Sequence, residues 1–582
     1  MSNLDFGWLA KFWKQRKGLM LLVFGLTVLS IVARTAYPLM FKFVLDKLSE
    51  QAAPSETRRW VMLLIAVGVY QGLMFAVLPN SRAYGNLVFG RLMREKVFDR
   101  ILRKGYDFFL KFRTGDVITR LTDDLEGSEL KLAWYSCSGV MRPIEMSLVI
   151  LFSLGVMFTL NWKLTLLIFI PLPAFIWMLA RSMRALEERA KVRQESIGEI
   201  NELLETTISG IRIVKGFGAE SRFGERLSNS LKDRVSAEVA FIKVNSEVQA
   251  VGQLVNNFGV VIALFVGGYF TIQGEMTIGS FFAFANYFQF LVEPIFTIGY
   301  FFAITKINFS YVDRLKEIET FPEPEPRVYR KPDSLESIAF EKITVRYPNT
   351  SRVILDDVSF KVQAGQTVAV VGPIGCGKTS LLEVTLGELQ PEAGSVTWNG
   401  IDIRELDPRE RHLRIGLVTQ EPLLFSETIV NNIRLGNSAL SDASIQEAMV
   451  TARLKDEVER FPDRANTVLG QRGIELSGGQ KQRLSLARAL AAKPELLLLD
   501  DVTSALDAET EQNFWRNFRL SYPKTTVIVV THRLATAAQA DCVVMLDERK
   551  IVANGSHLWL LKNNDRYRSF VEREEDEEAV AA

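Results

Sequence analysis

The 582-residue sequence predicts two fold classes in one chain: an α-helical transmembrane domain with six spans, then an α/β P-loop domain with a helical subdomain. Three observations predict this division. Long apolar segments are confined to residues 1–320, which form the transmembrane domain. Residues 321–334 are rich in proline, which blocks helix continuation, and form a linker. Over residues 335–571, short β-rich runs alternate with helical stretches, as in domains with a mainly parallel sheet.

The overall composition excludes several classes of protein. With 48% hydrophobic residues, the chain is too apolar to be disordered. Its three cysteines are few and far apart, which excludes a disulfide scaffold. Its three histidines form no Cys/His cluster at ligand spacing, which argues against a structural zinc site.

Six apolar segments are long enough to cross a membrane. The first, residues 19–41, can span about 30 Å of hydrocarbon as a helix. It is too long for the apolar core of a signal peptide, and no small-residue cleavage site follows it. The other five segments are residues 61–79, 140–160, 164–180, 249–272 and 281–307.

Two long polar stretches, residues 81–136 and 181–246, carry most of the positive charge of this half. Positive-inside asymmetry therefore places both stretches and both termini in the cytoplasm. Their spaced apolar residues predict that they continue the membrane helices into the cytosol, with separate soluble helices as the alternative. We expect an integral, multi-pass protein of the plasma membrane (the inner membrane in bacteria), surrounded by membrane lipids.

Charged side chains inside spans are costly and often functional. Arg34, Arg142, Glu145 and Glu293 lie in or near the predicted spans. One interpretation is that some of them line a substrate path. The alternative is that they are interfacial or form structural pairs.

A glycine-rich motif predicts a phosphate-binding loop. Residues 372–379 read GPIGCGKT, which fits G-x-x-x-x-G-K-[ST] and follows the predicted strand at 367–371. Glycines let the backbone fold around phosphate oxygens, Lys378 reaches the β- and γ-phosphates of a nucleotide, and the Thr379 hydroxyl can bind magnesium (Mg2+). The residues of this motif predicted to contact the nucleotide are Gly372, Gly375, Gly377, Lys378, Thr379 and Ser380.

A second motif supports the first. The aliphatic run at residues 496–499 ends at Asp500, and a buried strand that delivers a carboxylate at its carboxyl end is how such folds hold the metal. Alone, this run would more often be an ordinary core strand. Together with the phosphate loop it predicts a nucleotide site with Mg2+.

With these motifs in place, the chain resembles the ATP-binding-cassette (ABC) transporters. Residues 476–480 read LSGGQ, the signature sequence of that family, and the order of all motifs is also theirs. A membrane domain followed by a nucleotide-binding domain resembles a half-transporter of the multidrug or lipid exporter branch. Residues 114–116 and 210–220 look like the cytoplasmic coupling regions of that branch.

The resemblance implies a paired site. Two nucleotide-binding domains would meet head to tail, with each ATP between one chain's phosphate loop and the other chain's LSGGQ. The signature residues involved would be Ser477, Gly478, Gly479 and Gln480. Tyr347 would stack on adenine, or be an ordinary edge-strand tyrosine.

The resemblance also assigns the polar residues around the phosphates. Gln420 would sense the metal and the coupling regions, and His532 would contact the γ-phosphate; alternatively, both are solvated or structural polar residues. The segment 504–507 belongs to the same motif order. The implied cofactors are ATP and Mg2+, with Thr379, Gln420 and Asp500 at the metal.

The sequence departs from the family pattern at one position. The family usually has glutamate directly after the strand aspartate, where it polarises the attacking water, whereas this sequence has Asp501. Aspartate is one methylene shorter, and a carboxylate about 1 Å out of place orients a nucleophile poorly. We therefore expect this chain's site, with catalytic residues Asp501, His532 and Gln420, to bind ATP well and hydrolyse it slowly.

Together these features predict a subunit of an ATP-driven exporter for an apolar or amphipathic substrate. Its partner would be a second, different half-transporter chain that carries the catalytic glutamate. The alternatives are a homodimeric lipid or drug exporter that tolerates aspartate, and an ATP-gated regulatory or channel-like subunit. The six spans exclude a soluble ATPase acting on nucleic acid. The acidic tail at residues 572–582 is expected to be solvated, or else to contact a partner.

Overall fold

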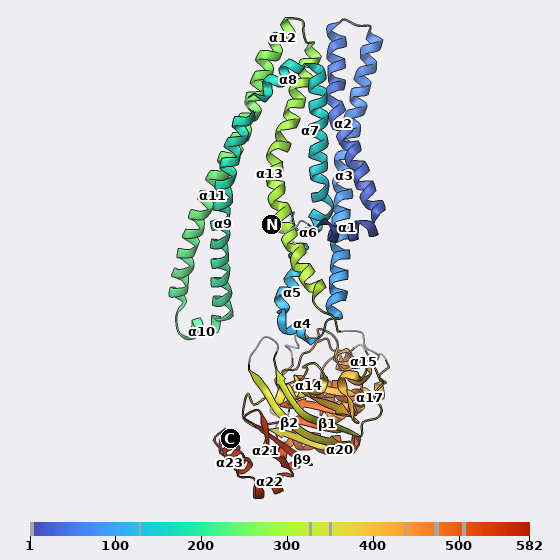
Figure 1. Ribbon diagram of the computed structural model, residues 1–582, viewed down its shortest axis with the longest axis vertical. Coiled ribbons are helices and arrows are strands. Elements are labelled where there is room, and N and C mark those ends of the chain that lie inside the picture. The colour runs from blue at the N-terminus through green and yellow to red at the C-terminus, as the bar shows by residue number, and fades with distance from the viewer. Residues whose placement is uncertain are drawn as a thin grey trace. The chain divides into compact units, whose positions relative to one another are not determined.

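The computed structural model describes residues 5–126, 130–170, 172–324, 329–347, 352–435, 437, 439–470, 476–502 and 508–581. For residues 172, 179, 256, 292–293, 295–300, 303, 508 and 576–581 it describes the backbone only. The chain divides into two units (Figure 1). The first, the membrane unit, comprises Met1–Leu102 and Thr114–Phe321. The second, the cassette unit, comprises Arg103–Arg113 and Pro322–Ala582.

In the described part of the membrane unit, all regular secondary structure is helical. Long helices α9 and α11 run side by side (Figure 1). The α-helices are α1 (Phe6–Gln15), α2 (Lys17–Ser49), α3 (Pro54–Leu102), α5 (Thr114–Leu121), α6 (Leu132–Trp134), α7 (Val140–Leu160), α8 (Trp162–Phe169), α9 (Leu172–Ser209), α10 (Ile211–Gly216), α11 (Glu220–Ile262), α12 (Gly268–Ile272) and α13 (Ile278–Thr320). Two π-helical turns, η1 (Tyr135–Gly139) and η2 (Ala263–Gly267), interrupt them.

Within the described residues, five helices are long and apolar enough to cross a membrane. They are Lys17–Ser49, Pro54–Leu102, Leu132–Leu160, Trp162–Ser209 and Glu220–Ile272, and they contain the first five predicted spans. The sixth predicted span, residues 281–307, lies in α13, which is 43 residues long but is not among those five. Large apolar side chains point outward from these helices: Phe75 is 84% exposed and Ile272 is 86% exposed. Exposed apolar side chains of this kind are suited to a lipid environment.

A charged pair with a buried arginine lies between the membrane helices. Arg82 on α3 donates a hydrogen bond to Glu145 on α7 (2.8 Å) and another to the hydroxyl of Thr27 on α2 (3.0 Å). Only 8% of Arg82 is exposed. Glu145 is thus paired with Arg82, a contact that the second interpretation of the intramembrane charges includes. The side chain of Glu293 lies outside the described residues.

The cassette unit has two sheets. The larger has the strand order β10-β9-β3-β8-β7-β6, in which all neighbours are parallel except β10 and β9. The smaller is antiparallel, in the order β2-β1-β4-β5. The strands are β1 (Ser337–Arg346), β2 (Val353–Gln363), β3 (Thr367–Val371), β4 (Ala393–Trp398), β5 (Ile401–Asp402), β6 (Ile415–Val418), β7 (Leu496–Asp500), β8 (Thr526–Val530), β9 (Cys542–Asp547) and β10 (Lys550–Gly555).

The predicted α/β domain is therefore confirmed, and the antiparallel sheet is a feature that the strand pattern did not predict. Strands β3, β7 and β8 are almost entirely buried aliphatic runs, as expected for a parallel sheet covered on both faces. A helical group, α16 (Ile429–Arg434) to α19 (Gly478–Ala491), lies in the chain between β6 and β7 and corresponds to the predicted helical subdomain.

This unit has further helices. They are α4 (Tyr106–Lys111), α14 (Lys378–Leu386), α15 (Pro408–His412), α17 (Asp442–Thr451), α18 (Lys455–Val458), α20 (Ala508–Ser521), α21 (Leu534–Gln539), α22 (His557–Asn563) and α23 (Asp565–Ala581), with short 3-10 turns η3 (Ile403–Glu405) and η4 (Arg464–Asn466). Of these, α17 and α18 belong to the helical group. The proposed boundary between residues 571 and 572 falls inside α23, so the acidic stretch continues a helix.

Candidate nucleotide-binding site

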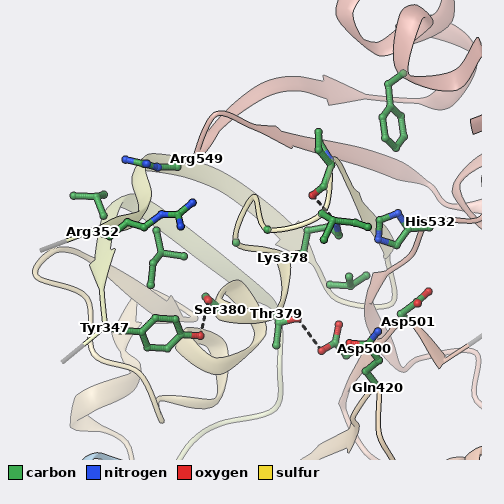
Figure 2. Close-up of a pocket in the computed structure, with 18 of the residues that line it drawn as sticks. Tyr347, Arg352, Lys378, Thr379, Ser380, Gln420, Asp500, Asp501, His532 and Arg549 are labelled. Carbon is green, nitrogen blue, oxygen red and sulfur yellow. Dashed lines mark hydrogen bonds between the residues drawn. The ribbon is translucent and has the colours of Figure 1, made fainter. Parts of the chain in front are cut away.

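A cavity of about 930 Å³ lies at the carboxyl ends of β3, β6, β7 and β8 (Figure 2). Parallel strands all end at the same edge of their sheet, so the side chains that follow them converge there. Of the predicted site residues, this cavity brings together Tyr347, Gly375, Gly377, Lys378, Thr379, Ser380, Gln420, Asp500, Asp501 and His532.

The phosphate loop has a backbone that requires glycine. Gly377 has φ +106°, and a Cβ there would lie 3.0 Å from the carbonyl oxygen of Ile354. Gly372 has φ +150°, and its Cβ would lie 2.0 Å from the carbonyl oxygen of Leu546. The loop therefore turns tightly into α14, and the first residues of this helix, Lys378 to Ser380, line the cavity. Amide groups at the start of a helix are suited to bind an anion.

Lys378 is folded back onto its own loop. Its Nζ donates to the carbonyl oxygens of Gly372 (2.7 Å) and Pro373 (3.0 Å), and the residue is 7% exposed. Burial lowers the pKa of this ammonium group, an effect that the nearby carboxylates of Asp501 and Asp500 oppose. A triphosphate would replace two carbonyl partners with stronger, charged ones.

Thr379 and Asp500 supply a pair of oxygens suited to Mg2+. The Thr379 hydroxyl donates to Oδ2 of Asp500 over 3.0 Å, and Gln420, after β6, lines the same side of the cavity (Figure 2). Burial raises the pKa of Asp500, although the hydrogen bond from Thr379 lowers it. Hydroxyl, carboxylate and amide oxygens are the ligand types that Mg2+ prefers. The residue types and their placement therefore fit the metal.

Asp501 and His532 lie at the ends of β7 and β8. The Asp501 amide donates to the carbonyl oxygen of Val530 (2.9 Å), and Asp501 has φ +48°, so its backbone is held in the left-handed region. Nδ1 of His532 lies 3.9 Å from a carboxylate oxygen of Glu574 on α23.

Tyr347 lies at the opposite side of the cavity, just after β1. Its hydroxyl lies 3.0 Å from Oγ of Ser380 and donates to Glu383 over 3.0 Å. Figure 2 shows the bond to Ser380. Burial is the main factor that raises the pKa of this hydroxyl, which keeps it protonated at neutral pH.

The signature segment forms a helix start of its own. Ser477 is the N-cap of α19: its side chain accepts a hydrogen bond from the amide of Gln480, whose side chain in turn accepts one from the amide of Ser477. Within the part of the chain that the structure describes, neither these residues nor Gly478 and Gly479 line the cavity. The predicted segment 504–507 lies outside the described residues.

Several residues at the cavity were not predicted from the sequence. α23 contributes Phe570, Arg573 and Glu574, and the cavity wall also includes Arg352 and Arg549. In the sequence, Arg573 and Glu574 belong to a run of charges with no motif. Only the tertiary fold places α23 beside the phosphate loop.

Comparisons with known proteins identify the family. The sequence family described as the ABC transporter transmembrane region matches residues 20–295, and the family described as ABC transporter matches residues 355–504. The chain is 30% identical over 525 residues to a protein of Bacillus subtilis (strain 168), the probable multidrug resistance ABC transporter ATP-binding/permease protein YheI, with 88% of each chain covered. This chain belongs to the ABC transporter family.

Other relatives of this ABC transporter extend the comparison. It is 30% identical over 551 residues to the ATP-dependent lipid A-core flippase of Desulfotalea psychrophila (strain LSv54 / DSM 12343), which covers 93% of this chain and 94% of the relative. Its fold matches a bacterial Atm1-family ABC exporter solved with ATP bound, with a TM-score of 0.80, 24% identity, and coverage of 96% and 98% of the two chains.

These findings confirm the central predictions. The protein is an integral membrane, ATP-hydrolysing ABC transporter that carries its membrane helices and its ATP-binding domain in one chain.

Proposed function

We propose that this chain is one half of an exporter that moves an apolar or amphipathic substrate out of the cytoplasm or the inner leaflet. The relatives named for multidrug resistance and for lipid A-core flipping support this substrate class. The proposal includes six spans, with α13 as the sixth, and both termini in the cytoplasm, as the distribution of basic residues indicates.

The observation that carries the proposal is the separation of two half-sites within one chain. The cavity holds the phosphate loop but none of the described signature residues, whereas Ser477 is exposed at the start of α19. Amide groups at the start of this 14-residue helix can bind a γ-phosphate. Each half-site therefore needs a second chain, which brings its own signature to this cavity and receives Ser477 at its own.

Mg2+ would be held by Thr379, Asp500 and Gln420 in this arrangement. When bound, the metal neutralises charge on the phosphate oxygens. The protein residues then have separate tasks: Lys378 binds the phosphates, Asp501 orients water, and His532 contacts the γ-phosphate.

We further propose that the partner is a different chain with glutamate at the position of Asp501. The shorter carboxylate makes this chain's own site hydrolytically weak, while its intact LSGGQ completes a strong site on the partner. A homodimer that tolerates aspartate and an ATP-gated, non-pumping subunit are the competing outcomes.

Transport in inside-out membrane vesicles tests the function. Vesicles with the wild-type complex should accumulate fluorescent amphipathic dyes or short-chain labelled lipids against a gradient, only with ATP and Mg2+. The control is vesicles in which Lys378 and the corresponding lysine of the partner are both replaced by alanine. ATP-dependent ion conductance without uphill accumulation would instead identify a gated channel.

A further inference from the structure

One carboxylate near the nucleotide cavity connects three segments of the cassette unit. Glu383 lies on α14, five residues after Lys378. One of its oxygens accepts a hydrogen bond from the hydroxyl of Tyr347 over 3.0 Å. The other accepts a hydrogen bond from the hydroxyl of Tyr106 over 3.1 Å, and Tyr106 begins α4. Glu383 thus links the chain after β1, the phosphate-loop helix and the segment Arg103–Arg113.

Both tyrosines remain donors to this carboxylate at neutral pH. Burial, followed by the charge of Glu383, raises the pKa of Tyr106 well above its usual value. Burial also raises the pKa of Tyr347. Hydrogen bonds from neutral donors to a charged acceptor are among the stronger ones in proteins. The two hydrogen bonds from Tyr106 and Tyr347 to Glu383 therefore persist at physiological pH.

The segment that carries Tyr106 is fixed to the cassette unit at further points. The Lys104 side chain is fully buried, and its Nζ lies 3.5 Å from Glu323. Phe108 is fully buried and Phe112 is 5% exposed. Residues 103–113, which directly precede the predicted coupling motif at 114–116, accordingly group with the cassette unit. The backbone that carries Tyr106 is thus held in place while its hydroxyl donates to Glu383.

We propose that Glu383 is a positioning residue of the ATP site and that Tyr106 holds it in place. The hydroxyl end of Tyr347 is held by Glu383 and Ser380, and this limits the movement of the ring that lines the cavity. The energy of stacking depends on how the ring is presented to the base. Affinity for the adenine part of ATP therefore depends on a residue of the segment 103–113, while affinity for the phosphates does not.

This inference rests on the proposed adenine contact of Tyr347, and a binding measurement separates it from transport. Full-length protein is photolabelled on this chain with 8-azido-ATP, and the label is competed with ATP or with inorganic tripolyphosphate. In Tyr106→Phe, competition by ATP should weaken about 3- to 10-fold. Competition by tripolyphosphate should not change, because this ion contacts only the phosphate loop.

Two further variants and a control define the test. Glu383→Ala should weaken ATP binding at least as much as Tyr106→Phe, and adding Tyr106→Phe to it should have no further effect. Glu383→Gln, which can still accept from one tyrosine, should restore part of the affinity. Asp107→Asn, an exposed change in the same helix, is the matched control.

Two results would overturn the proposal. One is unchanged ATP affinity in both Tyr106→Phe and Glu383→Ala. The other is an equal loss for ATP and tripolyphosphate, which would make Glu383 a general support of the loop. Tyr106→Phe removes a single oxygen atom from a half-buried side chain, so it carries the test even if Glu383→Ala does not fold. Failure of the unmodified protein to bind ATP would contradict the proposed function instead.

Discussion

Asp501 is the single residue on which the proposal of an asymmetric pair of ATP sites depends. Its amide is bonded to the carbonyl oxygen of Val530 and its φ is +48°, so a shift of the backbone to compensate for the short side chain would break this hydrogen bond. Asp501→Glu should therefore bring the carboxylate into reach and raise the ATPase rate of the purified complex about 10- to 100-fold. Phosphate release at saturating ATP measures this. Asp501→Asn is the control and should give no gain, and equal rates for Asp501→Glu and wild type would contradict the weak-site proposal.

Glu574 provides a second residue-scale prediction. Its carboxylate lies in the cavity, 3.9 Å from Nδ1 of His532, and its charge also acts on Lys378. A negative group there repels the phosphates of ATP. Glu574→Gln should tighten ATP binding by this chain about 2- to 5-fold, with a smaller effect at high salt. Equilibrium binding of a fluorescent ATP analogue measures the change. Glu572→Gln, an exposed change on the same helix, should leave the affinity unaltered.

At the scale of elements, the phosphate loop permits a matched pair of glycine substitutions. Gly375 and Gly377 both have positive φ, but an added Cβ meets nothing within 4 Å at Gly375. At Gly377 it would lie 2.8 Å from Cδ2 of Leu355 and 3.0 Å from the carbonyl oxygen of Ile354. Gly375→Ala should lower the free energy of unfolding by about 1 kcal/mol, and Gly377→Ala by about 2–3 kcal/mol with loss of ATP binding. Denaturant unfolding with and without ATP distinguishes the two, and identical losses would contradict the steric argument.

An element could be predicted from the sequence where residues close together in the chain determine it. The phosphate loop, β7 with Asp500, and five spans could be predicted because glycine spacing, an aliphatic run and length are properties of short segments. Glu383 and Glu574 could not, since each acts through a partner far away in the chain. The sequence likewise shows no reason for residues 103–113 to pack with the cassette, because Tyr106 meets Glu383 only in the folded unit. Local patterns thus predicted the phosphate loop, but not the roles of Glu383 and Glu574, whose partners lie near them only in the folded chain.

At the scale of the whole membrane unit, the pair of Arg82 and Glu145 joins helices distant in sequence. Removing one member of a buried pair leaves an uncompensated charge, which typically costs about 3–5 kcal/mol. Glu145→Gln should therefore lower the thermal midpoint of the detergent-solubilised protein. The double change Arg82→Met with Glu145→Met should recover much of the loss, because no charge remains buried. A double variant less stable than Glu145→Gln would contradict the argument that the cost comes from an uncompensated charge.

In the proposed dimer, the phosphate loop and the LSGGQ segment of one chain belong to different ATP pockets, so their roles can be tested separately. Ser477→Arg should abolish hydrolysis at the partner's pocket but leave 8-azido-ATP labelling of this chain intact, because Ser477 does not line this chain's own cavity. Lys378→Ala should do the reverse: it removes labelling of this chain, yet most of the ATPase activity of the complex persists at the partner's stronger site. In a homodimer, every pocket contains both residues, so either change would abolish hydrolysis. Parallel measurement of labelling and phosphate release thus distinguishes two unlike pockets from two equal ones, and complete loss of hydrolysis in Lys378→Ala would contradict the heterodimer.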